Sequence, residues 1–464
     1  MERLFDELGS LDRRCYEKFG LSEDILMEHA ANGISLYIRE NFKFGSKVLV
    51  VCGGGNNGAD GITLTRLLYK DYDVSLFNVS QPKSKMAILQ QKRVHLLGLK
   101  STIELNRCDI IVDAIYGTGF RDEFSDEVKS VLETINNMDS FKIACDVPTG
   151  LKQNGECDVD TFVADISLTM GGLKKSMFSD SAKEYVGDIK VIDLGLSRDI
   201  YELESSWNLL SFDDMRLPYR DKKNTHKGSY GHLAILSGEK SGASVMSGLS
   251  ALKFGSGLVT LVSDGRLNNI PYSIMESKTI PSNTTAIACG MGLGIDFSTS
   301  KLKSMLDNEL PLILDADIFY KIEVVEILKR KNVVITPHPK EFVSLLKLTN
   351  IADITVDELQ NNRFRYSEEF CEKYPDVTLI LKGANVIIAQ GDKFFINPHG
   401  TSALAKGGSG DILSGLVGSL LAQGYTPLDS AINGSLTHTK LAINYKGADF
   451  SLTPDDLING IGDL

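Results

Sequence analysis

Short apolar runs alternate with helix-like stretches along the chain, and this alternation constrains the fold more than any other feature. Up to residue 150 the runs are KVLVV, DVSLFNV, CDIIVDAI and FKIACDV, with helical patterns at 58–70 and 125–137. Such alternation predicts a parallel sheet with helices on both faces. A second series follows after about residue 215: HLAILSG, LVTLVS, TAIACGMG, PLILDA, NVVITP, VTLILKG and NVIIAQGDKFFI. The sequence therefore predicts an α/β protein built from two such units.

The length also favours two domains. The chain has 464 residues, whereas a single hydrophobic core usually stops growing at about 250–300 residues. The boundary is expected within 196–221, where charges are mixed with turn residues after the strand-like run GDIKVIDLG. We expect the domains to be 1–207 and 208–464.

Charge and cysteine content narrow the classes of partner. A formal net charge of -12 argues against nucleic acid and against an anionic membrane, which leaves small molecules as the expected ligands. The seven cysteines are scattered and form no CxxC motif, as is typical of reduced thiols in a cytosol. The first residues are charged throughout and contain no apolar segment of the length of a signal peptide or membrane span. A cytoplasmic location is expected.

The stretch VLVVCGGGNNGADG at 48–61 joins a strand to a glycine-rich turn with the G-x-G-x-x-G spacing that allows close approach to a pyrophosphate. A dehydrogenase of this fold carries an acidic residue about 20 positions later, at the end of the next strand. Here that strand ends in LFNVSQP, without an acid. The turn instead contains Asn56, Asn57 and Asp60, polar side chains suited to binding a ligand. The missing acidic residue and the polar turn argue against a dehydrogenase.

Two further strands end in polar residues. CDIIVDAIYGTGFRDE presents Asp113 and the turn Gly117–Gly119, and IACDVPTG presents Asp146 and Thr149. A lone aspartate at such a place more often caps a turn or helix. Ligands of open α/β sheets, however, gather at the carboxyl ends of the strands. Three such strand ends together favour a binding site over three separate caps.

The motifs GGGNNGADG, VDAIYGTG and DVPTG resemble those of the NAD(P)H-hydrate epimerase family, which has a Rossmann-like three-layer fold and binds the hydrated nicotinamide cofactor. The resemblance implies a potassium ion held by Asn57, Asp113 and Thr149, and oxygen ligands suit such a hard cation. Ala59 replaces the usual second glycine, and threonine stands where serine is common at 149. The implied substrate contacts are Asn56, Asn57, Gly58, Ala59, Asp60, Gly117, Thr118, Gly119, Phe120, Arg121, Asp122, Glu123 and Asp146.

Asp146 is also the expected catalytic residue of this first site. It follows an apolar strand and precedes Pro148, which biases Val147 to an extended conformation and leaves the aspartate at the carboxyl end of the strand. A carboxyl group there can shuttle a proton. Asp113, as a potassium ligand, must stay ionised and would be a poor acid.

The second unit contains LAKGGSGDIL, a glycine-rich turn that begins a helix and whose backbone N–H groups can receive an anion. Asp411 follows directly and can accept a proton from a hydroxyl group. The alternative is a loop-to-helix cap with an acid in the favourable first turn, and the tetrapeptide alone leaves both open. ILKGANVII predicts a strand, a turn and a strand suited to an adenine nucleotide, and His338 follows a strand in ITPHPKEF.

Together with HKGSYGHLAILSG, SGASVMSGLSALKFGSGLVTL and CGMGLG, these motifs resemble the ADP-dependent NAD(P)H-hydrate dehydratase family, a ribokinase-like fold, from about residue 208 onward. Lys340 stands where that family usually has glycine. The resemblance implies Asp411 as catalytic base and three groups of contacts. They are Ala243, Gly292, His338 and Asp411 for the substrate, Lys382, Gly383, Ala384, Asn385 and Val386 for ADP, and Gly407, Gly408, Ser409 and Gly410 for its phosphates.

Both resemblances, in this order, imply a bifunctional enzyme that repairs hydrated NADH and NADPH. The first domain would interconvert the R and S hydrates, and the second would dehydrate the S hydrate with ADP as co-substrate. The expected cofactors are potassium and, on general grounds of phosphoryl transfer, magnesium. The expected partners are NADHX, NADPHX and ADP, with no nucleic acid and no membrane, and a homo-oligomer is left open.

Two alternatives stay open at this point. The GGSGD motif is also similar to that of ribokinase-like kinases, so the second unit could phosphorylate a vitamin alcohol. The first unit could be a non-catalytic binding module, although the presence of Asn57, Asp113 and Asp146 argues against this.

Overall fold

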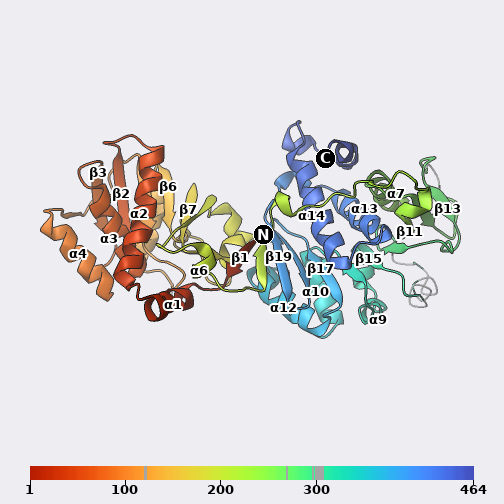
Figure 1. Ribbon diagram of the computed structural model, residues 1–464, viewed down its shortest axis with the longest axis horizontal. Coiled ribbons are helices and arrows are strands. Elements are labelled where there is room, and N and C mark those ends of the chain that lie inside the picture. Colours follow the sequence, from red (N-terminus) through yellow and green to blue (C-terminus); the bar gives the residue numbers. More distant parts are fainter. Residues whose placement is uncertain (120–122, 268–269, 295–296, 298–301, 303–307) are drawn as a thin grey trace. The chain divides into compact units, whose positions relative to one another are not determined.

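The computed structural model describes residues 1–119, 123–267, 270–294, 297, 302 and 308–464 (Figure 1). The chain divides into two compact units. One comprises Glu2–Trp207, and the other comprises Asn208–Leu464 together with Met1. The short strand β10 (Trp207–Leu209) contains the division point.

The N-terminal unit is built on a seven-stranded sheet in the order β4-β3-β2-β5-β6-β7-β9, and every pairing in it is parallel. The strand order reverses between β2 and β5, which is the switch point where Rossmann-like sheets bind ligands. The strands are β2 (Lys47–Cys52), β3 (Asp73–Asn78), β4 (Ser101–Thr102), β5 (Ile110–Ala114), β6 (Phe141–Cys145), β7 (Ile166–Met170) and β9 (Asp188–Ile192).

Helices cover both faces of this sheet because alternate side chains of each strand point to opposite faces. On β2, Val48 and Val50 pack into a core cluster with residues of α2 and α3. Leu49 and Val51 pack with residues of α5 into a second cluster on the other face. The predicted three-layer α/β arrangement is confirmed. The helices are α1 (Gly9–Phe19), α2 (Glu23–Asn41), α3 (Asn56–Leu68), α4 (Lys85–Leu96), α5 (Asp126–Asn136) and α6 (Arg198–Tyr201). A parallel pair, β1 (Glu2–Phe5) and β8 (Leu173–Lys174), completes the unit.

The C-terminal unit contains the strand order β13-β12-β11-β14-β15-β16-β17-β18-β19. The strands from β13 to β17 are parallel, and β17, β18 and β19 form antiparallel hairpins. The run NVIIAQGDKFFI therefore forms two strands, because Gly391, with φ 58°, lets the chain reverse between them. The strands are β11 (His232–Leu236), β12 (Leu258–Val262), β13 (Met275–Ser277), β14 (Ala286–Cys289), β15 (Leu312–Leu314), β16 (Val333–Ile335), β17 (Val377–Leu381), β18 (Val386–Gln390) and β19 (Lys393–Asn397).

Helix α13 packs against the sheet of this unit and against α7, with side chains from the sheet and both helices in one core cluster. The two helices approach so closely that a Cβ atom on Gly415 would lie 1.8 Å from the Ser250 hydroxyl oxygen, so only glycine fits. The helices are α7 (Ser241–Lys253), α9 (Val324–Ile327), α10 (Pro339–Leu348), α11 (Val356–Asn361), α12 (Arg363–Lys373), α13 (Ser409–Ala422), α14 (Pro427–Ile443) and α15 (Pro454–Gly460). Within the described ranges, every helix is too short or too polar to cross a membrane.

Candidate active sites

The glycine turn after β2 is a close-packed junction that opens onto a cavity. A Cβ atom on Gly53 would lie 2.0 Å from the carbonyl oxygen of Ile115, and one on Gly58 would lie 1.8 Å from the carbonyl oxygen of Gly53. Side chains are therefore excluded at both positions, and α3 begins directly after the turn. The N–H groups of its first turn have no partners within the helix, which suits an anionic ligand.

The cavity has a volume of about 460 Å³ and is lined from several loops of the N-terminal unit. Seven of the predicted residues line this cavity: Asn56, Asn57, Asp60, Gly117, Thr118, Gly119 and Asp146. Gly58 and Ala59 are buried in the first turn of α3 beneath it, and Glu123 is exposed. Phe120, Arg121 and Asp122 lie outside the described residues.

The three predicted potassium ligands come from the ends of neighbouring strands β2, β5 and β6. The hydroxyl group of Thr149 donates to Asp113 Oδ1 at 2.8 Å, and the Thr149 N–H donates to Oδ2 at 2.7 Å. Burial raises the pKa of Asp113 to about 6, against the lowering effect of these hydrogen bonds. The side-chain nitrogen of Asn57 is buried and has no hydrogen-bond partner among the described residues.

These residues fit a monovalent cation. The amide nitrogen and oxygen of asparagine have almost the same shape, so the opposite orientation places Oδ1 of Asn57 where the unpartnered nitrogen now stands. Asp113 and Thr149 add a carboxylate and a hydroxyl oxygen, and such oxygens are the ligands that hard cations prefer. A bound cation would also stabilise the ionised form of the buried Asp113.

Asp146 is held by an ion pair that the sequence analysis did not anticipate. Its Oδ1 atom accepts from Lys174 Nζ at 2.5 Å and from the Met170 N–H at 3.1 Å. The ammonium group of Lys174 is almost completely buried and also donates to Thr169 Oγ1 at 2.8 Å. The ion pair and the hydrogen bond fix Oδ1 of Asp146 and hold its carboxyl group in the wall of the cavity.

The Oδ2 atom of Asp146 faces the loop after β5. It lies 3.6 Å from where a Cβ atom on Gly117 would be, and Asp146 itself has a φ of 74°. This left-handed conformation costs an aspartate about 1 kcal/mol or more, which the contacts to Lys174 and Met170 offset. Oδ2 thus remains directed toward the cavity.

Two more carboxyl groups line the same cavity, those of Asp12 and Asp60. Burial, followed by the nearby charge of Asp146, raises the pKa of Asp60 well above its usual range. Burial also raises the pKa of Asp12, although a hydrogen bond from Tyr201 opposes the shift. The cavity therefore combines a carboxyl group that is ion-paired to a lysine with two carboxyl groups whose pKa is raised by burial, and such a set of groups can take part in general acid–base chemistry.

A second centre lies at the carboxyl ends of β15 and β17 in the C-terminal unit. Asp315, directly after β15, is 2% exposed. Its carboxylate accepts from Lys382 Nζ at 2.8 Å and from the Ser414 hydroxyl group at 2.7 Å. Lys382 directly follows β17, and Ser414 is on α13. Asp315 therefore ties the first turns of α13 to the edge of the sheet.

Asp411 lies in the first turn of α13, beside this ion pair. Burial, with a smaller contribution from Asp315, raises the pKa of Asp411 to about 6, and the ammonium of Lys382 partly opposes the shift. A Cβ atom on the preceding Gly410 would lie 3.5 Å from Lys382 Nζ. A carboxyl group with a pKa of about 6 is ionised at neutral pH yet still basic enough to take a proton from a hydroxyl group.

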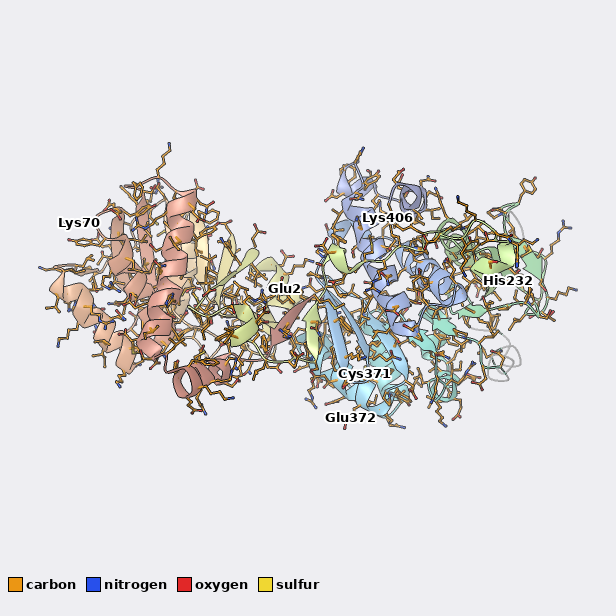
Figure 2. The ribbon with its side chains drawn as sticks, viewed as in Figure 1. Glu2, Lys70, His232, Cys371, Glu372 and Lys406 are labelled. Carbon is orange, nitrogen blue, oxygen red and sulfur yellow. The ribbon has the colours of Figure 1, made fainter. Side chains whose placement is uncertain are left out.

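The glycine-rich loop before α13 is fixed on both sides. Gly408 has a φ of 93°, and a Cβ atom there would lie 2.7 Å from Pro454. Lys406, labelled in Figure 2, precedes the loop and donates to the Phe450 carbonyl at 2.8 Å. Gly407, Gly408, Ser409 and Gly410 thus lead into the helix N-terminus as expected for an anion site. The remaining predicted nucleotide residues, Lys382, Gly383, Ala384, Asn385 and Val386, form the turn from β17 into β18.

His338 begins α10 in a capping box with Glu341. Its Nε2 atom lies 3.2 Å from Glu341 Oε1, and its backbone N–H donates to Glu341 Oε2 at 2.8 Å. Burial raises the pKa of Glu341 to about 7, and Lys382 Nζ is 3.9 Å from its Oε2 atom. His338 therefore joins the polar network around Lys382. The side chain of Lys340 is exposed.

Ala243 and Gly292 are brought together through one residue. The Lys240 N–H donates to the Gly292 carbonyl at 2.9 Å, and the Ala243 N–H donates to the Lys240 carbonyl at 3.2 Å. Gly292 has a φ of 64°, and a Cβ atom there would lie 2.3 Å from the Lys240 carbonyl oxygen. The loop continues to Gly294, whose N–H donates to Asp317, two residues after Asp315. This loop therefore borders the second centre.

Known families match both halves of the chain. The family model described as YjeF-related protein N-terminus matches residues 23–176, and the model described as NAD(P)H-hydrate dehydratase matches residues 233–461. A bifunctional NAD(P)H-hydrate repair enzyme of Helicobacter pylori is 42% identical over 100% of both chains. One from Coxiella burnetii is 30% identical over 94% of this chain and 93% of its own.

A solved structure also resembles the C-terminal half. It is an ADP/ATP-dependent NAD(P)H-hydrate dehydratase from Bacillus subtilis, co-crystallised with ATP and Mg²⁺, with 27% identity and a TM-score of 0.46, covering 55% of this chain and 96% of its own. The assignment does not depend on it, because the sequence identities extend over both full lengths. Both resemblances expected from the motifs are confirmed, and the chain belongs to the family of bifunctional NAD(P)H-hydrate repair enzymes.

Proposed function

We propose that this chain repairs hydrated NADH and NADPH in two steps. Residues 1–207 interconvert the R and S hydrates, and residues 208–464 dehydrate the S hydrate with ADP as co-substrate. The observation that carries the proposal is the presence of two separate acid–base centres at strand ends, one around Asp146 and Lys174 and one around Asp411 and Lys382. The family to which the chain belongs supports the same pair of activities.

In the dehydratase step, hydroxide is a poor leaving group, and phosphorylation of the ring hydroxyl converts it into a good one. Asp411 accepts the hydroxyl proton while the oxygen attacks the terminal phosphorus of ADP, and AMP departs. The N–H groups of Gly407–Gly410 stabilise the charge on the transferring group. Phosphate then leaves with the C–O bonding electrons, the ring nitrogen lone pair assists, and loss of a proton from the adjacent ring carbon restores the double bond.

The remaining predicted residues hold the reactants. Lys382–Val386 bind the nucleotide, and Ala243, Gly292 and His338 border the hydrated ring. Among the described residues, no group of three or more His, Cys, Asp or Glu side chains is arranged to hold a metal ion. This fits Mg²⁺ entering on the nucleotide phosphates, because Mg²⁺ is usually held by substrate phosphates, waters and one or two carboxylates. When bound, it would neutralise phosphate charge.

In the epimerase step, the residues that line the cavity bind the hydrate, and Asp146 moves a proton. Asn57, Asp113 and Thr149 would hold potassium, which supplies a fixed positive charge near the substrate. We also propose that the enzyme works in the cytoplasm, which is supported by the free thiols of all seven cysteines.

The test supplies the purified chain with a mixture of R and S hydrates, ADP and Mg²⁺, and follows the absorbance of NADH. Recovery should require ADP and should exceed the fraction that was S at the start, because the R hydrate is converted during the assay. Recovery that stops at the S fraction would remove the epimerase assignment. Formation of a stable phosphorylated alcohol without NADH would instead support a kinase.

A further inference from the structure

Helix α1 contributes a carboxyl group to the epimerase cavity from outside the sheet. Leu8, Gly9 and Asp12 line the cavity, although they precede the segment 23–176 matched by the family model. Figure 1 draws α1 in dark red, next to one end of α2 and outside the strands. Asp60 and Asp146 come from α3 and from the end of β6, which belong to the central layers. The cavity therefore receives carboxyl groups from two structural layers.

Asp12 is held in place by a dedicated partner. The hydroxyl group of Tyr201 donates to Asp12 Oδ1 at 2.8 Å, and the Tyr201 side chain is 1% exposed. Arg14, on the same helix, donates to the carbonyls of Ile200 and Tyr201, the latter at 2.7 Å. Leu8, Leu11, Cys15 and Tyr201 belong to one core cluster. Helix α1 is thus a packed wall of the cavity.

Tyr201 also contacts the loop that supports Asp146. A Cβ atom on Gly171, with φ 73°, would lie 2.6 Å from the tyrosine ring, so glycine is required for the ring to lie there. The neighbouring Met170 donates its N–H to Asp146 Oδ1. One tyrosine therefore connects the supports of both carboxyl groups. Asp12 and Asp146 are also close enough for their charges to affect each other.

We propose that Asp12 is a second catalytic residue of the epimerase site, with Tyr201 as its positioning residue. This inference rests on the proposed epimerase function. The R and S hydrates differ at the ring carbon that carries the hydroxyl group, so inversion requires loss of that group from one face and addition of water to the other. Such a reaction needs a proton donor at one face and a proton acceptor at the other, and a single carboxyl group cannot serve both.

The reaction balances with these two residues. The carboxyl group of Asp12 donates its proton to the hydroxyl group, the C–O bond breaks with both electrons leaving on water, and the ring nitrogen lone pair forms a C=N bond. Water then adds to the opposite face, gives its proton to the Asp146 carboxylate, and returns the electron pair to nitrogen. Exchange with solvent restores both groups, and the reverse reaction exchanges their roles. Burial of Asp12 supports the role of donor.

The test compares Asp12→Asn with Glu17→Gln, an exposed carboxylate on the same helix. R-to-S conversion should slow about 10²-fold or more in Asp12→Asn, on the scale of a lost acid–base group, and remain unchanged in Glu17→Gln. ADP-dependent dehydration of purified S hydrate should be unaffected in both. R-to-S conversion at the wild-type rate in Asp12→Asn would overturn the proposal. A loss of conversion in Asp60→Asn, with none in Asp12→Asn, would overturn it as well.

Two further measurements keep the outcome clear. Fluorescence of Trp207, the single tryptophan and part of the N-terminal unit, reports whether each variant is folded. If Asp12→Asn does not fold, the Tyr201→Phe variant tests the proposal instead. It keeps the Asp12 carboxyl group and removes only the hydroxyl group that donates a hydrogen bond to it. We expect kcat for epimerisation to fall by up to about tenfold, the scale of one hydrogen bond between neutral groups, with KM unchanged, and an unchanged kcat contradicts the proposal. Failure of the wild-type chain to epimerise contradicts the proposed function itself.

Discussion

The ion pair between Lys382 and Asp315 offers a quantitative test of how the dehydratase centre is held together. Replacing Lys382 with methionine keeps the length of the side chain and removes its ammonium group. The Asp315 side chain is 3% exposed and, among the described residues, would then keep the Ser414 hydroxyl group as its one side-chain donor. A buried carboxylate that has lost its cation is strongly destabilising.

The expected loss in the free energy of unfolding follows from the burial of Lys382 and Asp315. Removing one partner of a buried ion pair typically costs about 3–5 kcal/mol. The Lys382 side chain is 22% exposed, so water partly screens the interaction, and Asp315 can take up a proton. We therefore expect a loss at or just below the lower limit of that range, about 2–3 kcal/mol. The double variant Lys382→Met/Asp315→Asn should recover most of it, because the neutral amide can still accept from Ser414.

The assay is urea unfolding followed by far-ultraviolet circular dichroism. The transition that belongs to the C-terminal unit should move to lower urea in Lys382→Met. Lys347→Met is a matched control, because Lys347 pairs with Asp353 at the surface, where such pairs contribute little. A shift in Lys382→Met no larger than in Lys347→Met, or no recovery in the double variant, would refute the reasoning.

Three further predictions concern the chemistry. Asp411→Asn should reduce ADP-dependent NADH recovery by about 10²–10⁴-fold and leave R/S interconversion intact. Because the pKa of Asp411 is raised to about 6 and its ionised form is the base, the wild-type dehydration rate should fall as pH drops through about 6, measured with saturating ADP. Asp146→Asn should slow R-to-S conversion about 10²-fold, so that mixed hydrates are repaired quickly only for the S portion. Crystals soaked with rubidium or thallium should show an anomalous peak among Asn57, Asp113 and Thr149, and its absence would exclude that cation site.

The sequence predicted most of what depends on short-range pattern. The alternation of apolar and helical stretches predicted both sheets. The glycine-rich turn after β2 was also predicted, and its close packing leaves no room for a side chain at Gly53 or Gly58. Asp113, Asp146 and His338 could be proposed as site residues because the carboxyl ends of parallel strands meet at one edge of a sheet. Asp315 obeys the same rule at the end of the run PLILDA, so the available signal was sufficient to find it.

Lys174 and Asp12 could not be found in this way because their roles depend on contacts across the fold. Lys174 belongs to a two-residue strand, and its place in the site comes from its 2.5 Å contact with Asp146, 28 residues earlier, and from its position in the cavity lining. Asp12 is on a helix, and its partner Tyr201 is 189 positions away. Neither pairing has a local pattern to reveal it. In the mechanism proposed above these contacts decide the chemistry, because Lys174 holds Oδ1 of Asp146 and Tyr201 holds Asp12 at the same cavity. In that mechanism, conversion of R to S hydrate depends on groups that only the folded chain brings together.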